Sequence, residues 1–357
     1  MSAAARVGEA ARHWGIKLGP EEAAGLAGLV ERVEAGLDGL DGPGGPGGTS
    51  SAGSVPVDTR PGPAPDRADG SAWVWKASVE ELAGRTVAGP LAGWRVGVKD
   101  LVAVAGHPVR CGSAATWDAP AEAADAPIVA ALREAGGVVV GATKLHEFAF
   151  GTTGVNAPFG TPDNPAAPGR APGGSSSGSG AAVAAGEADL AVGTDTGGSV
   201  RIPAALCGVI GLKPSSGALP TDGVVALSPT LDHVGFLVGD VEHLVAASAA
   251  LGLLGPGAAR EAPEPASLRL GVARGVIDLC DGEVVDGWLA ALERLAGAFE
   301  LVEVDWPGGE AVFAATTAIM FAEAAHGHGA RLARRGHLYG VDVRNRLLQG
   351  AALDARR

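Results

Sequence analysis

The sequence predicts an α/β fold in which helices flank a mixed, largely parallel central sheet. Short runs rich in β-branched residues alternate with helical patterns from about residue 94 onward, and no repeat of fixed period is visible. The chain has 357 residues, of which 46% are hydrophobic and 19% are charged. This composition supplies a core for one large domain or two ordinary ones.

The first 40 residues predict a helical appendage that precedes the main domain. Apolar residues at the three- and four-residue spacing of an amphipathic helix follow Pro20, which suits a first helical turn; they are Leu26, Leu29, Val30, Val33, Leu37 and Leu40. Residues 41–71 are dense in glycine, proline and serine. Such a segment buries too little apolar surface to order itself, so we expect a linker there and the main domain over 72–357.

Strands and helices are expected to alternate through the main domain. The expected strands are 94–98, 138–140, 190–193, 268–273 and 301–304. The expected helices are 126–134, 179–188, 284–299 and 311–335. Asp125 is expected to cap the first of these helices, with Pro127 in its first turn.

Charge and motif content exclude several classes of protein. The net charge of −13 argues against a nucleic-acid partner, because phosphate binding needs concentrated lysine and arginine. No secretory signal is visible, and no apolar run approaches the ~20 residues that span a bilayer, so we expect a cytoplasmic protein without membrane contact. Cys111, Cys207 and Cys280 lack metal-site or disulfide spacing. Phosphate-loop, dinucleotide-binding and zinc-peptidase motifs are also absent from the sequence.

Two segments rich in glycine and serine interrupt the apolar structure. The first, 172–180, leads directly into an alanine-rich helix, and taken alone it is equally compatible with a flexible linker. The second, 193–203, joins an expected strand to an expected helix and contains Ser199. Glycine lets successive backbone N–H groups converge on one point, which is what an oxyanion hole beside a nucleophile requires.

These two segments resemble the signature of the amidase signature family of serine hydrolases. Similarity extends from about Ala88 to Asp240 and more weakly to the C-terminus. Further family-like motifs follow in the family's order at 96–100, 151–156, 211–214 and 228–235. The resemblance implies the amidase signature fold. Because family members usually continue further, we expect the main domain to be incomplete at its C-terminal end.

The resemblance implies a catalytic triad of Ser199 as nucleophile, Ser175 as bridging serine and Lys99 as base. It also implies that the peptide joining Gly174 to Ser175 is cis. A lysine can accept a proton only when it is neutral, and burial disfavours the ammonium form. Lys99 follows an apolar strand, so we expect a buried side chain with a lowered pKa.

Further roles follow from the resemblance. The implied oxyanion donors are the backbone N–H groups of Thr196, Gly197, Gly198 and Ser199. Ser176, Asp195 and Arg201 are expected to support the site, although a purely structural ion pair between the last two stays open. His146 and His233 are expected to be structural or to line a pocket, because the implied triad needs no histidine.

The expected function is hydrolysis of a small-molecule carboxylic amide through an acyl-enzyme on Ser199, with no metal or organic cofactor. One alternative is a glutaminase subunit of an amidotransferase of the glutamyl-tRNA type, and another is a truncated, non-catalytic binding or assembly module. A homo-oligomer is possible. The GxSxG pattern at 174–178 also suggests an α/β-hydrolase nucleophile elbow, but the proline-rich segment before it does not suit the required central strand.

Overall fold

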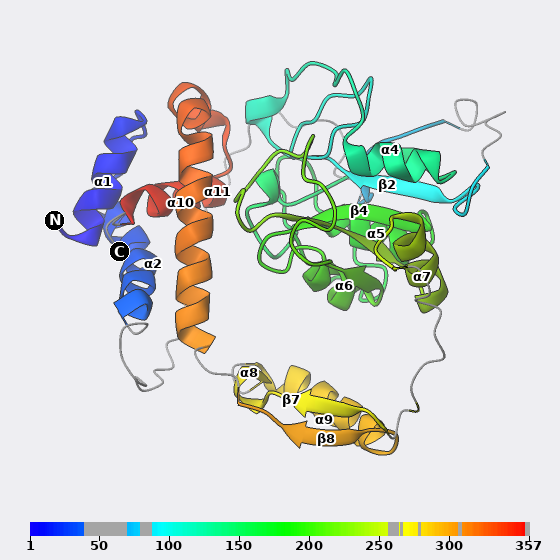
Figure 1. The fold of residues 1–357 in the computed structure, drawn as a ribbon. Helices are drawn as coiled ribbons and strands as arrows, with labels where there is room; N and C mark the ends of the chain where they lie inside the picture. The colour runs from blue at the N-terminus through cyan, green and yellow to red at the C-terminus, as the bar shows by residue number, and fades with distance from the viewer. Residues whose placement is uncertain are drawn as a thin grey trace. The chain divides into compact units, whose positions relative to one another are not determined.

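The computed structural model describes residues 1–38, 70–78, 88–255, 264, 267–277, 280–305 and 309–353. Within these ranges the chain forms two compact units. The first contains residues 1–31, 70–254 and 318–353, and the second contains 32–38 and 255–317 (Figure 1). Nearly all of the linker expected at 41–71 lies outside the described residues, so the division into appendage, linker and main domain stays a prediction.

A six-stranded mixed sheet forms the centre of the first unit, in the order β1-β3-β2-β4-β6-β5. The strands are β1 (Trp73–Lys76), β2 (Arg95–Lys99), β3 (Val138–Thr143), β4 (Leu190–Asp195), β5 (Ile210–Leu212) and β6 (His233–Val238). β2 pairs in parallel with both β3 and β4, whereas β1 and β6 run antiparallel to their neighbours. The mixed sheet is confirmed, and four of its six strands share one direction.

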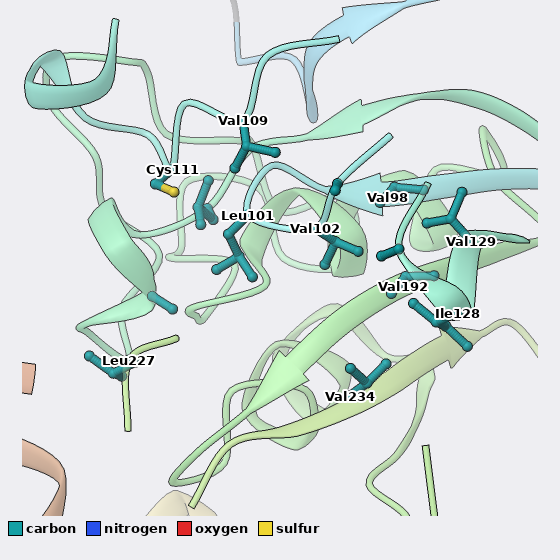
Figure 2. Packing of buried hydrophobic residues seen from close by; sticks show 14 of the residues in the cluster. Val98, Leu101, Val102, Val109, Cys111, Ile128, Val129, Val192, Leu227 and Val234 are labelled. Carbon is teal, nitrogen blue, oxygen red and sulfur yellow. The ribbon is translucent and has the colours of Figure 1, made fainter. Parts of the chain in front are cut away.

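Helices cover both faces of this sheet. α4 (Pro127–Glu134) and α7 (Val241–Ala250) pack on one face, and α5 (Ser177–Ala184) and α6 (Arg201–Cys207) pack on the other. Side chains alternate along a strand, so Val192 of β4 faces α4 while its neighbour Ala191 faces α5. Figure 2 shows Ile128 and Val129 of α4 beside Val192 and Val234 of the sheet.

The first and last described helices pack together in this unit. α1 (Ala3–His13) packs on α11 (Val341–Ala352), and small or branched residues line their contact: Ala3, Val7, Ala11, Leu348 and Ala352. α2 (Pro20–Asp38) and α10 (Gly309–Arg335) each begin or end in the other unit. Short 3₁₀ turns complete the described elements of this unit at Ala114–Thr116, Glu147–Ala149 and Gly336–Leu338.

The second unit contains a parallel pair of strands, β7 (Arg269–Val272) and β8 (Glu300–Glu303). α8 (Arg274–Ile277) and α9 (Gly282–Ala296) lie between them in the chain. The strands and the longer helix agree with the sequence prediction to within three residues at each end. Across the described residues, no helix is both long and apolar enough to cross a bilayer.

The expected capping role of Asp125 is wrong. The N-cap residue of α4 is Ala126, and no side chain caps this helix. The Asp125 carboxylate instead accepts a hydrogen bond from the backbone N–H of Ala105 at 2.8 Å and pairs with Arg133 at 2.9 Å. These contacts hold the carboxylate away from the free N–H groups of the first helical turn.

The contact between α10 and α11 requires a glycine at position 350. A Cβ added to Gly350 would lie 2.0 Å from the carbonyl oxygen of Phe321, whereas a Cβ added to Gly327 of α10 would meet nothing within 4 Å. We expect Gly350→Ala to reduce the free energy of unfolding by about 1–3 kcal/mol through overpacking. Gly327→Ala should leave it unchanged or raise it by up to about 1 kcal/mol, since alanine favours helix. Urea denaturation of both variants checks this, and equal stability would contradict the packing described.

Candidate active site

Lys99 lies at the end of β2, between β3 and β4, and its side chain is fully buried at 0% exposure. Its ammonium nitrogen Nζ donates hydrogen bonds to Ser175 Oγ at 2.7 Å and to Thr194 Oγ1 at 2.9 Å. Burial lowers the pKa of Lys99 to about 7, although the charges of Asp195 and Asp232 act in the opposite direction. A large fraction of this amine is therefore neutral near pH 7.

The loop that carries Ser175 immediately precedes α5. The peptide between Gly174 and Ser175 is cis. The Gly174 N–H donates to the Thr152 carbonyl at 2.7 Å, and the Ser175 carbonyl accepts from the His146 N–H at 3.0 Å. A Cβ on Gly174 would lie 2.6 Å from the backbone nitrogen of Gly154, so only glycine fits. Packing and hydrogen bonds on both sides thus fix the position of Ser175 beside Lys99.

The loop that carries Ser199 joins β4 to α6, and the buried carboxylate of Asp195 organises it. Asp195 accepts hydrogen bonds from the backbone N–H groups of Gly198 at 2.7 Å and Val200 at 3.1 Å. It also accepts two from the Arg201 guanidinium, at 2.8 and 3.0 Å. Burial alone would raise the pKa of Asp195, but these hydrogen bonds outweigh it and lower the pKa. The carboxylate therefore stays charged, and its hydrogen bonds fix the conformation of the loop.

One of the four expected oxyanion donors already has an acceptor within the protein. The Gly198 N–H donates to Asp195, so it is not free to receive an oxyanion. Within the described ranges, no acceptor is recorded for the N–H groups of Thr196, Gly197 and Ser199. Gly197 is exposed, which leaves this part of the loop accessible from solvent. The oxyanion hole expected from the sequence thus reduces to three candidate donors.

The two serine loops lie against each other. The Ser176 N–H donates to the Ser199 carbonyl at 3.2 Å, and the Ser176 hydroxyl donates to the Thr194 carbonyl at 3.3 Å. Ser199 is only 6% exposed. No hydrogen bond joins the hydroxyls of Ser175 and Ser199 in the part of the chain that the structure describes. The expected proton relay is thus half formed, because Lys99 is hydrogen-bonded to Ser175 but, among the described residues, Ser175 is not hydrogen-bonded to Ser199. Hydrogen bonds between catalytic groups often shorten only when substrate binds.

Approach of the two loops depends on Gly193 of β4. A Cβ at this position would lie 2.7 Å from Ser176 Oγ and 3.0 Å from Val200 Cγ2. Either contact would force one of the serine loops away from the other. Glycine at 193 therefore sets how closely the segments around Ser175 and Ser199 can approach.

Sequence reasoning assigned no role to three residues that support this site. Thr194 accepts from Lys99. Asp232 accepts from the Thr196 hydroxyl at 2.6 Å and from the N–H groups of Leu227 and Ser228 at 2.8 and 3.0 Å. Glu323 of α10 accepts from the Ser228 hydroxyl at 2.6 Å and from the hydroxyl and N–H of Thr230 at 2.7 and 3.1 Å. Thr194 carried a local signal as a hydroxyl beside an apolar strand, and Asp232 lies in the family-like motif at 228–235, whereas Glu323 carried none.

The remaining singled-out residues lie around the site without joining it. The His146 ring contacts Asp342 of α11 at 3.1 Å, and His233 Nδ1 contacts the Leu231 carbonyl at 2.7 Å. Burial raises the pKa of Cys207 to about 11, which makes it a poor nucleophile at neutral pH. Cys111 is also buried, and burial raises its pKa as well. Neither thiol is activated.

The chain is similar in sequence and in fold to known amidases and to amidotransferase subunits. A sequence profile described as Amidase matches residues 70–335. The A subunit of the glutamyl-tRNA(Gln) amidotransferase of Haloarcula marismortui is 40% identical over 253 residues, covering 66% of this chain and 59% of that protein. The indoleacetamide hydrolase of Pseudomonas savastanoi is 42% identical over 222 residues, covering 60% and 47% of the two chains. A crystal structure described as that of an amidase superimposes with a TM-score of 0.72 at 32% identity, covering 93% of this chain and 71% of that one.

The hydrogen bond from Lys99 to Thr194 favours the ammonium form, so its removal should lower the pKa of Lys99 further. We expect Thr194→Val to shift the midpoint of the lysine titration about one unit below that of the unaltered chain, because one hydrogen bond to a charged group contributes about 1.5 kcal/mol or more. ¹³C NMR of isotopically labelled lysine measures this midpoint. Thr143→Val is the matched control, since this buried threonine of β3 contacts Ser179 instead. An equal shift in both variants would contradict the assignment.

Proposed function

The chain belongs to the amidase family, as its motifs predict, and from this membership we propose that it hydrolyses a carboxylic amide to a carboxylate and ammonia or an amine. The reaction would pass through an acyl-enzyme on Ser199. The observation that carries the proposal is the 2.7 Å contact between the fully buried side chains of Lys99 and Ser175. Such a contact, with the Lys99 pKa near 7, suits a base that acts at neutral pH.

In the proposed first step, neutral Lys99 takes the proton of the Ser175 hydroxyl while Ser175 takes that of Ser199. The Ser199 oxygen attacks the amide carbonyl, and the C=O π electrons move onto oxygen. The N–H groups of Thr196, Gly197 and Ser199 would then stabilise the negative charge on that oxygen, because fixed donors need no reorganisation during the reaction. Arg201 and Asp195 would position this loop without touching the substrate.

In the next step the tetrahedral intermediate collapses and the carbon–nitrogen bond breaks. The proton held by Lys99 returns through Ser175 to the departing nitrogen, because an amine anion is a very poor leaving group. Water then attacks the acyl-enzyme with the same relay as base, and the carboxylate leaves Ser199 with its proton restored. One relay therefore serves both halves of the reaction, and no cofactor takes part in the proposal.

A second candidate is a glutaminase subunit that passes ammonia to a partner protein. The similarity to the Haloarcula marismortui amidotransferase chain favours it, whereas the similarity to the Pseudomonas savastanoi hydrolase favours an independent amidase. Hydrolysis of a panel of aliphatic, aromatic and dicarboxylic amides that includes glutamine separates the two. Glutamine turnover that requires a co-purified second protein would favour the glutaminase; turnover of other amides by the isolated chain would favour the amidase. Homo-oligomerisation and a cytoplasmic location stay predictions.

A fluorophosphonate probe distinguishes an enzyme from a non-catalytic module. We expect the probe to label the unaltered chain, and Ser199→Ala to abolish labelling because the nucleophile is gone. Ser215→Ala, which alters an exposed serine outside the site, should label normally. Lys99→Ala should lower the labelling rate by about 10²–10⁴-fold, the usual contribution of a general base. Mass spectrometry of the labelled peptide provides the measurement, and near-normal labelling of Lys99→Ala at neutral pH would refute the proposed base.

The pKa of Lys99 also predicts how amide hydrolysis depends on pH. Only the neutral amine accepts a proton, so kcat/KM should rise as pH rises through about 7 and level off above it. Below that value the rate should fall about tenfold per pH unit, as the base becomes protonated. Circular dichroism over the same range separates this effect from unfolding. A profile that stays flat between pH 5.5 and 8.5 in a folded protein would rule out Lys99 as the base.

A further inference from the structure

A cavity of about 250 Å³ lies in the first unit, in a region separate from the candidate active site. The turn after α1, the C-terminal end of α10 with the 3₁₀ turn that follows it, and the first half of α11 form its walls. Its lining includes Trp14, Ile16, Lys17, Arg334, His337 and Arg344. We propose that this cavity binds a small phosphate-bearing anion.

The charge of the lining contrasts with the rest of the chain. Acidic residues outnumber basic ones by 40 to 27 in the whole sequence. The cavity nevertheless draws Lys17, Arg334 and Arg344 from three separate segments, adds His337, and includes no Asp or Glu in its lining. Cations gathered without counter-charges create a local positive potential that attracts anions even on an acidic protein.

The described part of the chain offers these cations no ion-pair partner. Within the described residues, no ion pair or side-chain hydrogen bond is formed by Lys17, Arg334 or Arg344. Their neighbours behave differently, because Arg335 pairs with Asp118 and Arg346 pairs with Asp342. Nε of Arg344 is buried and has no acceptor among the described residues. A buried donor without an acceptor is rare in folded proteins.

The backbone segments that form the walls of the cavity pack against one another. A Cβ at Gly329 would lie 3.5 Å from Trp14 Nε1, and one at Gly336 would lie 3.6 Å from Ile16 Cγ1, both ordinary contact distances. The turn that carries Lys17 therefore rests directly on α10 and the 3₁₀ turn. Because these segments are packed before a ligand binds, bringing their cations to one place costs no further backbone entropy.

Size and charge together select the ligand class. A volume near 250 Å³ is below the roughly 300–1,000 Å³ typical of pockets for drug-sized ligands. Arginine presents its donors as a planar fork that suits phosphate and carboxylate oxygens, and lysine adds a compact charge. Three cations around a small space match a doubly charged phosphate better than a single carboxylate. Inorganic phosphate and small phosphomonoesters share this chemistry.

Isothermal titration of the full chain with inorganic phosphate, at constant ionic strength and pH, tests the proposal. We expect saturable binding at one site per chain. Arg344→Gln and Lys17→Gln should each weaken binding about tenfold or more, as expected for loss of a hydrogen bond to a charged group. Arg269→Gln, which alters an exposed arginine of β7 outside the cavity, should bind as the unaltered chain does. Glycerol phosphate and succinate serve as parallel ligands.

Several outcomes would overturn the inference. These are a failure of phosphate to saturate, equal affinity in the cavity variants and Arg269→Gln, or succinate binding as tightly as phosphate. Tighter binding of glycerol phosphate than of inorganic phosphate would support the site and identify a phosphomonoester as its ligand; the reverse would support it and identify the free ion. If Arg344→Gln does not fold, Arg334→Gln replaces it, because Arg334 is exposed and its loss removes no packing. None of these variants touches the candidate active site.

Discussion

Burial of the Lys99 amine at the end of β2 limits which groups can surround it. The hydrogen-bond partners recorded for its amine, the hydroxyls of Ser175 and Thr194, carry no charge. A carboxylate in direct contact would hold the ammonium charged, whereas burial among neutral groups favours the free amine. The fold therefore has to place two hydroxyl groups within hydrogen-bond distance of the amine and keep carboxylates out of direct contact with it. The strand end, the loop before α5 and the last residues of β4 together do this.

Two carboxylates organise the surrounding loops instead of neutralising the lysine. Asp195 gathers backbone N–H groups of the Ser199 loop and the Arg201 guanidinium. Asp232 joins Thr196 to the turn at Leu227 and Ser228, and Glu323 of α10 holds that turn in its place. The charges of Asp195 and Asp232 raise the pKa of Lys99 through space, whereas their hydrogen bonds are made to the surrounding loops. A loop fixed in this way has its donors oriented in advance, which is the condition for electrostatic stabilisation of a developing charge.

Strands and site residues could be predicted from the sequence where their signal is local. They could not be predicted where they depend on contacts between segments far apart in the chain. β2, β3 and β4 are short valine-rich runs and were expected, whereas β5 has only three residues and β1 follows a segment rich in glycine and proline. Lys99, Ser175 and Ser199 were proposed as the triad from motifs that follow in the order of the family, and the structure brings Ser175 beside Lys99. Glu323 could not be found, because its partners lie far earlier in the chain. Two further expectations meet a competing partner. The Asp125 carboxylate, expected as a helix cap from its residue type, accepts from Ala105 instead. The Gly198 N–H, implied as an oxyanion donor by the resemblance, donates to Asp195.

The need for glycine at position 193 allows homologous chains to be distinguished by the residue at this position. The space beside it admits a hydrogen atom but no methyl group, because Ser176 Oγ and Val200 occupy what remains. A homologue with alanine at this point could thus retain the lysine and both serines of the proposed relay yet place them too far apart to exchange protons. Inspection of that single column in an alignment would help to separate degenerate copies from competent ones. A survey restricted to the reactive side chains would count both as intact.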